Sequence, residues 1–198
     1  MHSTRDTFMK KTDIITLPHD SLRQRSTRVR VITDEVKQLV EDMQSATLDW
    51  EANREHEVGV ALAAVQINNL QRVVVVREDF NDKSNQNFEV YIDPEIVKYE
   101  GVIEEDFEGC LSVKNVYGKV PRHTKIRLKA LNLEGKEVRV KAEGFLARVF
   151  QHEIDHTNGK LFVDHIEGHP ELFYKLSDSG KIEELDDDER TEIFSEIF

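Results

Sequence analysis

Two histidines and a glutamate late in the chain have the spacing of a metal site. They are His152, Glu153 and His156, within the sequence His-Glu-Ile-Asp-His. Because an α-helix has about 3.6 residues per turn, the two imidazoles lie one turn apart on one helix face and can share a metal ion. Glu153 then projects beside the metal, where it can take a proton from water and deliver it to a leaving group. The alternative is a surface helix with two incidental histidines.

A third protein ligand is needed to complete such a site, and Cys110 is the conspicuous candidate. As a thiolate it would leave one position open for water, which is typical of a catalytic rather than a structural metal site. A free cysteine is also commonly a small buried apolar residue. Four further histidines are rival ligands by composition, namely His56, His123, His165 and His169. These ligand types accept Fe(II), Zn(II), Ni(II) or Co(II), so they do not select the metal.

A run of small and apolar residues, 59–66, ends at the polar side chain of Gln66. Small residues allow a close approach of two backbones, and the Gln66 amide could donate an N–H to a developing oxyanion. Such a run is also typical of simple close packing.

The two histidines are predicted to lie on a helix over residues 144–157. Apolar residues recur there at intervals of three and four, and the following Asn-Gly pair offers a left-handed stop. An earlier helix is predicted from Thr33, which can cap it, to Trp50. Its first turn is acidic, and its apolar residues have helical spacing.

Extended segments are predicted around these helices from β-branched runs and alternating patterns. They cover residues 73–76, 88–92, 96–102, 126–133 and 161–166. An Asp-Pro pair separates the second from the third. The fourth is predicted to turn at a Glu-Gly pair into a hairpin that includes Val138 and Val140.

The C-terminal segment is strongly acidic, since residues 182–198 contain eight acidic residues and one base, Arg190. Asp186 and Glu189 have the spacing of a capping box, which predicts a helix. Its negative charge disfavours docking on RNA phosphates. We expect its apolar stripe to pack on the body of the protein, although a protein partner or a second copy of the chain could cover it instead. The stripe consists of Ile193, Phe194, Ile197 and Phe198.

The composition is that of a soluble globular protein. Of the 198 residues, 38% are hydrophobic and 33% are charged, and the net charge of −12 disfavours nucleic acid and anionic membranes as partners. No stretch approaches the roughly 20 apolar residues of a membrane helix, and residues 1–11 lack the apolar run of a secretory signal. The sole cysteine excludes an intrachain disulfide. We therefore expect a cytoplasmic protein with one domain over residues 1–198.

Three stretches, taken in order, resemble the motifs of the peptide deformylases, which read G-x-G-x-A-A-x-Q, E-G-C-L-S and Q-H-E-x-D-H. Here they are residues 59–66, 108–112 and 151–156, and the second and third motifs are complete. The resemblance extends from about residue 14 to about residue 164.

The resemblance implies an α+β fold. A central metal-binding helix would be surrounded by mostly antiparallel strands, with an N-terminal helix on one side and an acidic C-terminal helix. The core of this deformylase-like domain would span about residues 14–166, followed by an acidic C-terminal extension over about residues 167–198.

The resemblance also implies a reaction. Cys110, His152 and His156 would hold one divalent metal ion per chain, which is usually ferrous iron in this family. Water on the metal would attack the formyl carbon of an N-formyl-methionyl peptide or nascent chain, and formate would be released.

Further roles follow from the same resemblance. Glu153 would be the general acid and base, while Gln66 and the backbone N–H of Leu111 would stabilise the oxyanion. Gly59 would lie beside the substrate backbone. Three charged residues would orient the ligands, namely Glu108, Arg122 and Asp155.

The sequence departs from the family pattern at Ala61, where the first motif usually has its second glycine, and at Lys114 and Tyr117, which replace a proline and an arginine. These departures leave open a redirected or non-catalytic homologue that binds N-terminal peptides. A zinc endopeptidase is a further alternative that rests on the His-Glu-x-x-His pattern alone. In a fourth interpretation Cys110 is the nucleophile of a Cys-His hydrolase.

Overall fold

The structure is a computed structural model and describes residues 13–52, 54, 56–177 and 179–197. The expectation for residues 1–11 and the place of Phe198 in the apolar stripe therefore lie outside the described residues. No helix within these ranges combines the length and the apolar character needed to cross a membrane.

Seven strands of the described residues form one sheet. Its order is β1-β2-β3-β4-β6-β7, and β5 pairs with β4 beside this path. The strands are β1 (Ala61–Ala63), β2 (Val73–Arg77), β3 (Phe88–Cys110), β4 (Val113–Leu131), β5 (Glu137–Glu143), β6 (Phe173–Leu176) and β7 (Ile182–Glu184). Each strand pairs antiparallel with its neighbours. Together with the helices, this sheet confirms the predicted α+β class.

The α-helices of the described chain are α1 (Asp34–Glu51), α2 (Gly144–Thr157) and α3 (Asp187–Ile197). Both predicted internal helices are confirmed. Thr33 occupies the N-cap position of α1, but its side chain makes no capping hydrogen bond. The chain leaves α2 through Gly159, whose φ of +75° is the left-handed conformation expected of the Asn-Gly stop.

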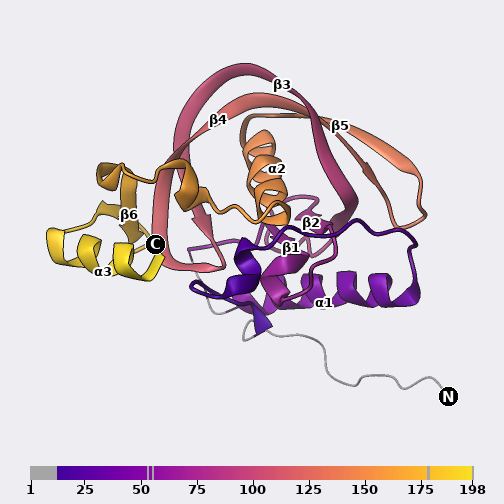
Figure 1. Cartoon of the computed structure of the whole chain (residues 1–198), viewed down its shortest axis with the longest axis horizontal. Helices are drawn as coiled ribbons and strands as arrows, with labels where there is room; N and C mark the ends of the chain where they lie inside the picture. The colour runs from indigo at the N-terminus through magenta and orange to yellow at the C-terminus, as the bar shows by residue number, and fades with distance from the viewer. Residues whose placement is uncertain (1–12, 53, 55, 178, 198) are drawn as a thin grey trace.

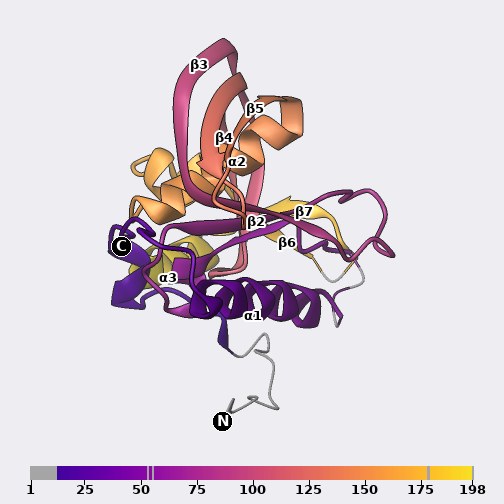
Figure 2. The same cartoon turned by 90° about the vertical axis from the view of Figure 1, so that its right-hand side faces the viewer.

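Strand β2 is buried on both faces. Val73 and Val75 pack with residues of α1, whereas Val74 and Val76 pack with residues of α2. Figure 2 shows β2 between the two helices. A strand that is covered on both faces needs apolar residues at every position, which explains the run of four valines.

Strands β3 and β4 form a long ribbon that arches over α2 (Figure 1). The two strands predicted at residues 88–92 and 96–102 are parts of β3, so their separation was wrong. The register shifts between Ile92 and Glu95, and Asp93 has a φ of +53°, so a β-bulge absorbs the Asp-Pro pair. The predicted hairpin is confirmed by β5, which pairs with the end of β4.

The predicted extended segment at residues 161–166 is also wrong, because it contains a short 3-10 helix (Phe162–His165). The Asp164 carboxylate accepts a hydrogen bond from the Leu161 N–H at 2.8 Å and pairs with Arg23 at 2.6 Å. The hydrogen bond to Leu161 favours a turn over a strand, and the ion pair with Arg23, a residue far away in the sequence, holds this turn in place. Further 3-10 helices cover Asp20–Arg23, Ala64–Ile67 and Pro170–Leu172.

Helix α3 packs on the body of the protein, as predicted. Asp186 and Glu189 form the expected capping box, with hydrogen bonds of 3.0 and 2.9 Å. The ring of Phe194 lies 4.8 Å from that of Phe173 in β6, and Ile197 is buried. The body therefore covers the described part of the apolar stripe. The boundary of the extension near residue 167 stays a prediction.

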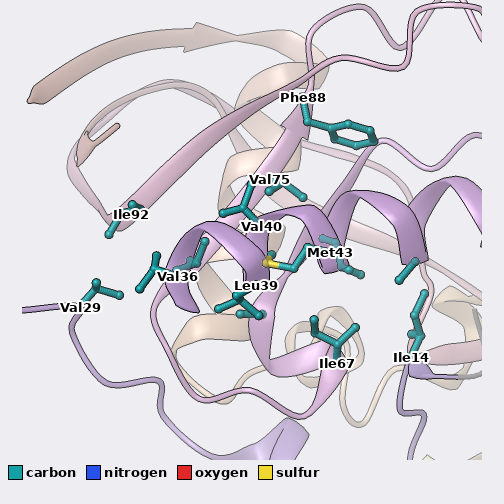
Figure 3. Packing of buried hydrophobic residues seen from close by; sticks show 14 residues of the cluster. Ile14, Val29, Val36, Leu39, Val40, Met43, Ile67, Val75, Phe88 and Ile92 are labelled. Atoms are coloured by element: carbon teal, nitrogen blue, oxygen red, sulfur yellow. The ribbon is translucent and has the colours of Figure 1, made fainter. Parts of the chain in front are cut away.

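Met43 of α1 points into the core between this helix and the sheet. Its side chain is fully buried, with Val40 of α1 and Val75 of β2 nearby (Figure 3). The same core holds α1 against the strands that lead into the cleft described below.

Replacing Met43 by alanine is expected to lower the free energy of unfolding by about 2–5 kcal/mol, because the substitution removes buried atoms and leaves a cavity. Urea-induced unfolding measures this change. Val31→Ala is the control, since Val31 is 69% exposed, and its effect should stay below about 0.5 kcal/mol. Equal stabilities of the two variants would contradict the packing described here.

Candidate active site

Three potential metal ligands converge where β3 ends beside α2. Cys110 is the last residue of β3, and His152 and His156 lie one turn apart on α2. One ligand atom from each residue lies within 4.8 Å of the others. The Cys110 Sγ lies 3.2 Å from the His156 Nε2. The structure therefore brings together the three residues that were predicted as ligands.

Glu108 orients His152. Its Oε2 lies 2.9 Å from the His152 Nδ1, which leaves the Nε2 of that ring directed towards Cys110. Two guanidinium groups hold the carboxylate, with Arg122 donating at 2.9 and 3.1 Å and Arg148 at 2.8 Å. Burial opposes ionisation of Glu108, but the hydrogen bonds from His152 and Arg122 outweigh it and hold its pKa well below the usual range.

The chemistry of this group fits a divalent metal ion. Burial holds the pKa of His156 well below its usual value, which favours the neutral imidazole that binds metals. At His152 burial is outweighed by the hydrogen bonds to Cys110 and Glu108, which raise the pKa, so a metal ion would displace a proton from that ring. One thiolate and two imidazoles leave an open position in a tetrahedral site. The two imidazoles differ in their partners. The His152 Nδ1 has the Glu108 carboxylate, whereas no described residue is hydrogen-bonded to the His156 Nδ1.

Glu153 lies next to His152 and faces the same cleft. Its side chain is buried, and among the described residues its Oε2 has no hydrogen-bond partner. Burial raises the pKa of Glu153 to about 7. A carboxyl group with such a pKa can both accept and donate a proton near neutral pH, and a bound cation would lower this pKa again.

Gln66 points its amide group at the metal ligands. Its Oε1 accepts a hydrogen bond from the Ala63 N–H at 2.9 Å, which fixes the amide orientation. Its Nε2 then donates to the Ser112 Oγ at 3.2 Å and lies 3.6 Å from the Cys110 Sγ. Leu111 follows Cys110 directly in the turn between β3 and β4 and lines the same cleft, and the role of its backbone N–H stays a prediction.

Gly59 lies behind the cleft wall rather than in it. Its N–H donates to Glu51 at 2.8 Å, and a Cβ placed on Gly59 would lie 2.6 Å from the Thr47 Cγ2 of α1. The neighbouring Val58 and Val60 line the cleft. Glycine is therefore required here for close packing on α1, and contact of Gly59 with the substrate stays a prediction.

The rival histidines lie outside the metal group. His56 is at the rim of the cleft. His165 pairs with Asp155 at 2.7 Å, and His169 pairs with Glu171 at 3.1 Å. The ring of His123 packs at 5.1 Å from that of Tyr99.

Three charged residues were expected to orient the ligands, namely Glu108, Arg122 and Asp155, and Arg122 lies between the two carboxylates. It pairs with Glu108 and with Asp155, the latter at 2.5 Å. Sequence reasoning missed Arg148, although an arginine among the apolar residues of the 144–157 helix was a signal that its guanidinium needs a buried partner.

The cleft holds about 630 Å³ and is lined by Cys110, His152, Glu153, Gln66 and further residues of four separate segments, whereas His156 is fully buried and is not among the lining residues. This volume is within the usual range for small-molecule sites. One end of a bound peptide can therefore reach the metal group.

One thiol and two imidazole ligands beside the buried carboxyl group of Glu153, within this α+β fold, define a metal-dependent hydrolase. The family model described as Polypeptide deformylase matches residues 11–171. The chain belongs to this family. Its membership favours the deformylase interpretation over the zinc endopeptidase and the Cys-His hydrolase.

Relatives and solved structures agree with this assignment. The peptide deformylase of Thermomicrobium roseum is 45% identical over 164 residues, which cover 81% of this chain and 89% of the relative. Peptide deformylase 2 of Clostridium acetobutylicum is 41% identical over 143 residues, or 72% of this chain and 87% of the relative. The crystal structure of a peptide deformylase from Legionella pneumophila has a TM-score of 0.72 at 33% identity and covers 96% of this chain and 93% of its own.

Replacing Glu108 by glutamine is expected to lower metal affinity about 10- to 100-fold, because the partner that orients His152 changes. Competition with a chromophoric chelator measures the affinity. Glu105→Gln is the matched control on the same strand, since its carboxylate is 52% exposed and lies 3.9 Å from Lys119. Equal affinities of the two variants would contradict an orienting role for Glu108.

Proposed function

We propose that this chain hydrolyses the formyl group from N-formyl-methionyl peptides and releases formate. The observation that carries the proposal is the group of Cys110, His152 and His156, two of which line an open cleft together with Glu153. Newly synthesised chains are the proposed source of substrate, and the cytoplasm is the proposed compartment. The net charge of −12 argues against nucleic acid as a direct partner.

Cys110, His152 and His156 would hold the metal ion, which we propose to be Fe(II) because the resembled family usually contains it. The same ligands accept Zn(II), Ni(II) and Co(II). When bound, the metal supplies Lewis-acid chemistry, which makes water a nucleophile near neutral pH and polarises a carbonyl group.

Glu153 moves the proton in this scheme. It takes a proton from the attacking water, whose oxygen forms a bond to the formyl carbon. It then delivers this proton to the amide nitrogen as the carbon–nitrogen bond breaks. The products are formate and a peptide with a free amino group. The position of Glu153 in the cleft next to His152, with an Oε2 that has no hydrogen-bond partner among the described residues, supports both steps.

Gln66 and Leu111 stabilise the charge that develops on the formyl oxygen. Both N–H groups belong to residues beside Cys110, and the Gln66 amide is held in place before substrate binds. Donors that are oriented in advance stabilise a transition state without reorganisation during the reaction.

Replacing Glu153 by alanine is expected to lower formate release from formyl-Met-Ala-Ser by at least about 100-fold, because the proton acceptor and donor is lost. The measurement uses protein purified without oxygen and loaded with Fe(II). Chelator-treated protein should be inactive, and added Fe(II) should restore its activity. Glu143→Ala is the matched control, because Glu143 precedes α2 and its side chain is 66% exposed.

No formate release by wild-type protein with stoichiometric metal would contradict the proposal. It would favour the redirected or non-catalytic homologue that binds N-terminal peptides. Release that persists without metal would instead favour a nucleophilic role for Cys110.

Replacing Gln66 by leucine is expected to lower kcat by about 100- to 1,000-fold with little change in KM, because a donor to the oxyanion is removed. Steady-state kinetics and metal analysis on the same samples measure these quantities. The exposed Gln38, which bonds to Asp42 on α1, provides the control Gln38→Leu. A raised KM with unchanged kcat would show that Gln66 binds substrate and does not stabilise the oxyanion.

A further inference from the structure

The C-terminal hairpin, formed by β6 and β7, contributes to the cleft although it lies outside the family match. The family model ends at residue 171, whereas β6 begins at Phe173. Leu176, at the end of β6, and Ser177 both line the cleft, as do Cys110 and His152. A segment beyond the matched residues 11–171 therefore supplies part of the cleft wall.

The hairpin is fixed on the strand that follows the metal-binding turn. β6 pairs with β4 through Lys175 opposite Val116 and Tyr174 opposite Tyr117. On its other side, Lys175 forms an ion pair with Glu189 of α3. The sheet and α3 therefore hold Leu176 in place.

The hairpin also contacts the opposite rim of the cleft. Gly180, in the turn after β6, lies against His56, because a Cβ on this glycine would be 2.6 Å from the His56 Cγ. Tyr117, which pairs with β6, donates a hydrogen bond from its hydroxyl to Glu57 at 2.8 Å. These contacts join the hairpin to the segment around residues 56–58 and define the width of the cleft.

Leu176 supplies the side chain that a ligand can contact in this wall. The Ser177 hydroxyl is already used, since it donates to the Lys181 carbonyl at 3.0 Å and accepts from the Lys181 N–H at 3.2 Å. The Leu176 side chain is half-buried and apolar. Contact between this side chain and an apolar group of a ligand would bury apolar surface and so stabilise the complex.

The strand register gives the distance of this wall from the reaction centre. Lys175 of β6 pairs with Val116 of β4, so the next residue, Leu176, lies beside Asn115. Asn115 is two residues from Val113, which pairs with Cys110 of β3. Strands rise about 3.3 Å per residue and lie about 4.8 Å apart, which places Leu176 roughly 12 Å from the Cys110 backbone. An extended peptide covers this distance with about three or four residues, so the third residue is the first whose side chain can reach Leu176.

We propose that Leu176 forms an apolar subsite for the third residue of the formylated peptide. This inference rests on the proposed function. The C-terminal hairpin thereby selects substrates beyond their methionine, and peptides with an apolar residue at this position are preferred.

The test compares kcat/KM for formyl-Met amide, formyl-Met-Leu-Leu and formyl-Met-Ser-Ser. Wild-type protein should prefer the leucine peptide over the serine peptide. Replacing Leu176 by alanine should lower kcat/KM for the leucine peptide about five- to tenfold, as expected for the loss of part of one apolar contact. Turnover of formyl-Met amide should stay within about twofold.

Ile182→Ala is the matched control. Ile182 is the direct partner of Leu176 on β7, and it does not belong to the described lining of the cleft. This variant loses the same cross-strand contact but should keep the wild-type preference. A second variant, Leu176→Asp, should reverse the preference in favour of formyl-Met-Lys-Lys, because a carboxylate then faces the peptide.

Each outcome decides the proposal. Equal losses on all three substrates, an unchanged preference in Leu176→Ala, or a matching loss in Ile182→Ala would overturn the subsite. If wild-type protein still turns over formyl-Met amide, such a result overturns only the subsite and leaves the proposed function intact. No turnover of any substrate would overturn both.

Discussion

The buried carboxylate of Glu108 connects the elements that build the metal group. It is held by Arg122 from β4 and by Arg148 from α2, and it orients His152. A buried charge costs several kcal/mol unless it is paired and hydrogen-bonded. Here both oxygens have partners, so the three elements stabilise one another only when all of them are in place. Cys110 follows two residues later on the same strand, which fixes the third ligand relative to the other two.

Arg148 extends this constraint to the ribbon above the helix. Besides Glu108, its guanidinium donates to the carbonyls of Val120 at 2.7 Å and Glu104 at 2.8 Å, one on each strand of the ribbon. Buried carbonyls without partners would be costly. The Arg148 side chain of α2 thus provides hydrogen-bond donors to backbone carbonyls of the β3–β4 ribbon that arches over the helix. Because these positions are fixed in the folded chain, the metal ligands do not need to be ordered by the metal or the substrate.

The sequence predicted the elements whose stability is local and missed those that depend on distant partners. Helix α2 has its own apolar periodicity and its own stop at Gly159, so both ends could be predicted. Much of β3 is solvent-exposed and charged, and its pairing with β4 is specified across the ribbon rather than by alternation within the strand. β6 has only four residues and pairs with β4 more than fifty positions earlier. In the site, residue type and sequence spacing were enough to identify the two histidines and Glu153. The partners of Arg148 lie on β3 and β4, and sequence spacing does not show where these strands lie relative to α2.

The departures from the family pattern lie on the wall of the cleft and not in the metal group. Ala61 belongs to β1 and pairs with Val76, so its backbone is extended and does not require glycine. Its methyl group therefore narrows the cleft without straining the chain. Lys114 lines the same cleft, and Tyr117 holds Glu57 across it. The ligand His152, in contrast, is held by Glu108, which buried arginines hold in turn. Since none of the three departures is hydrogen-bonded to that network, the cleft wall can vary while the geometry of the metal group stays the same.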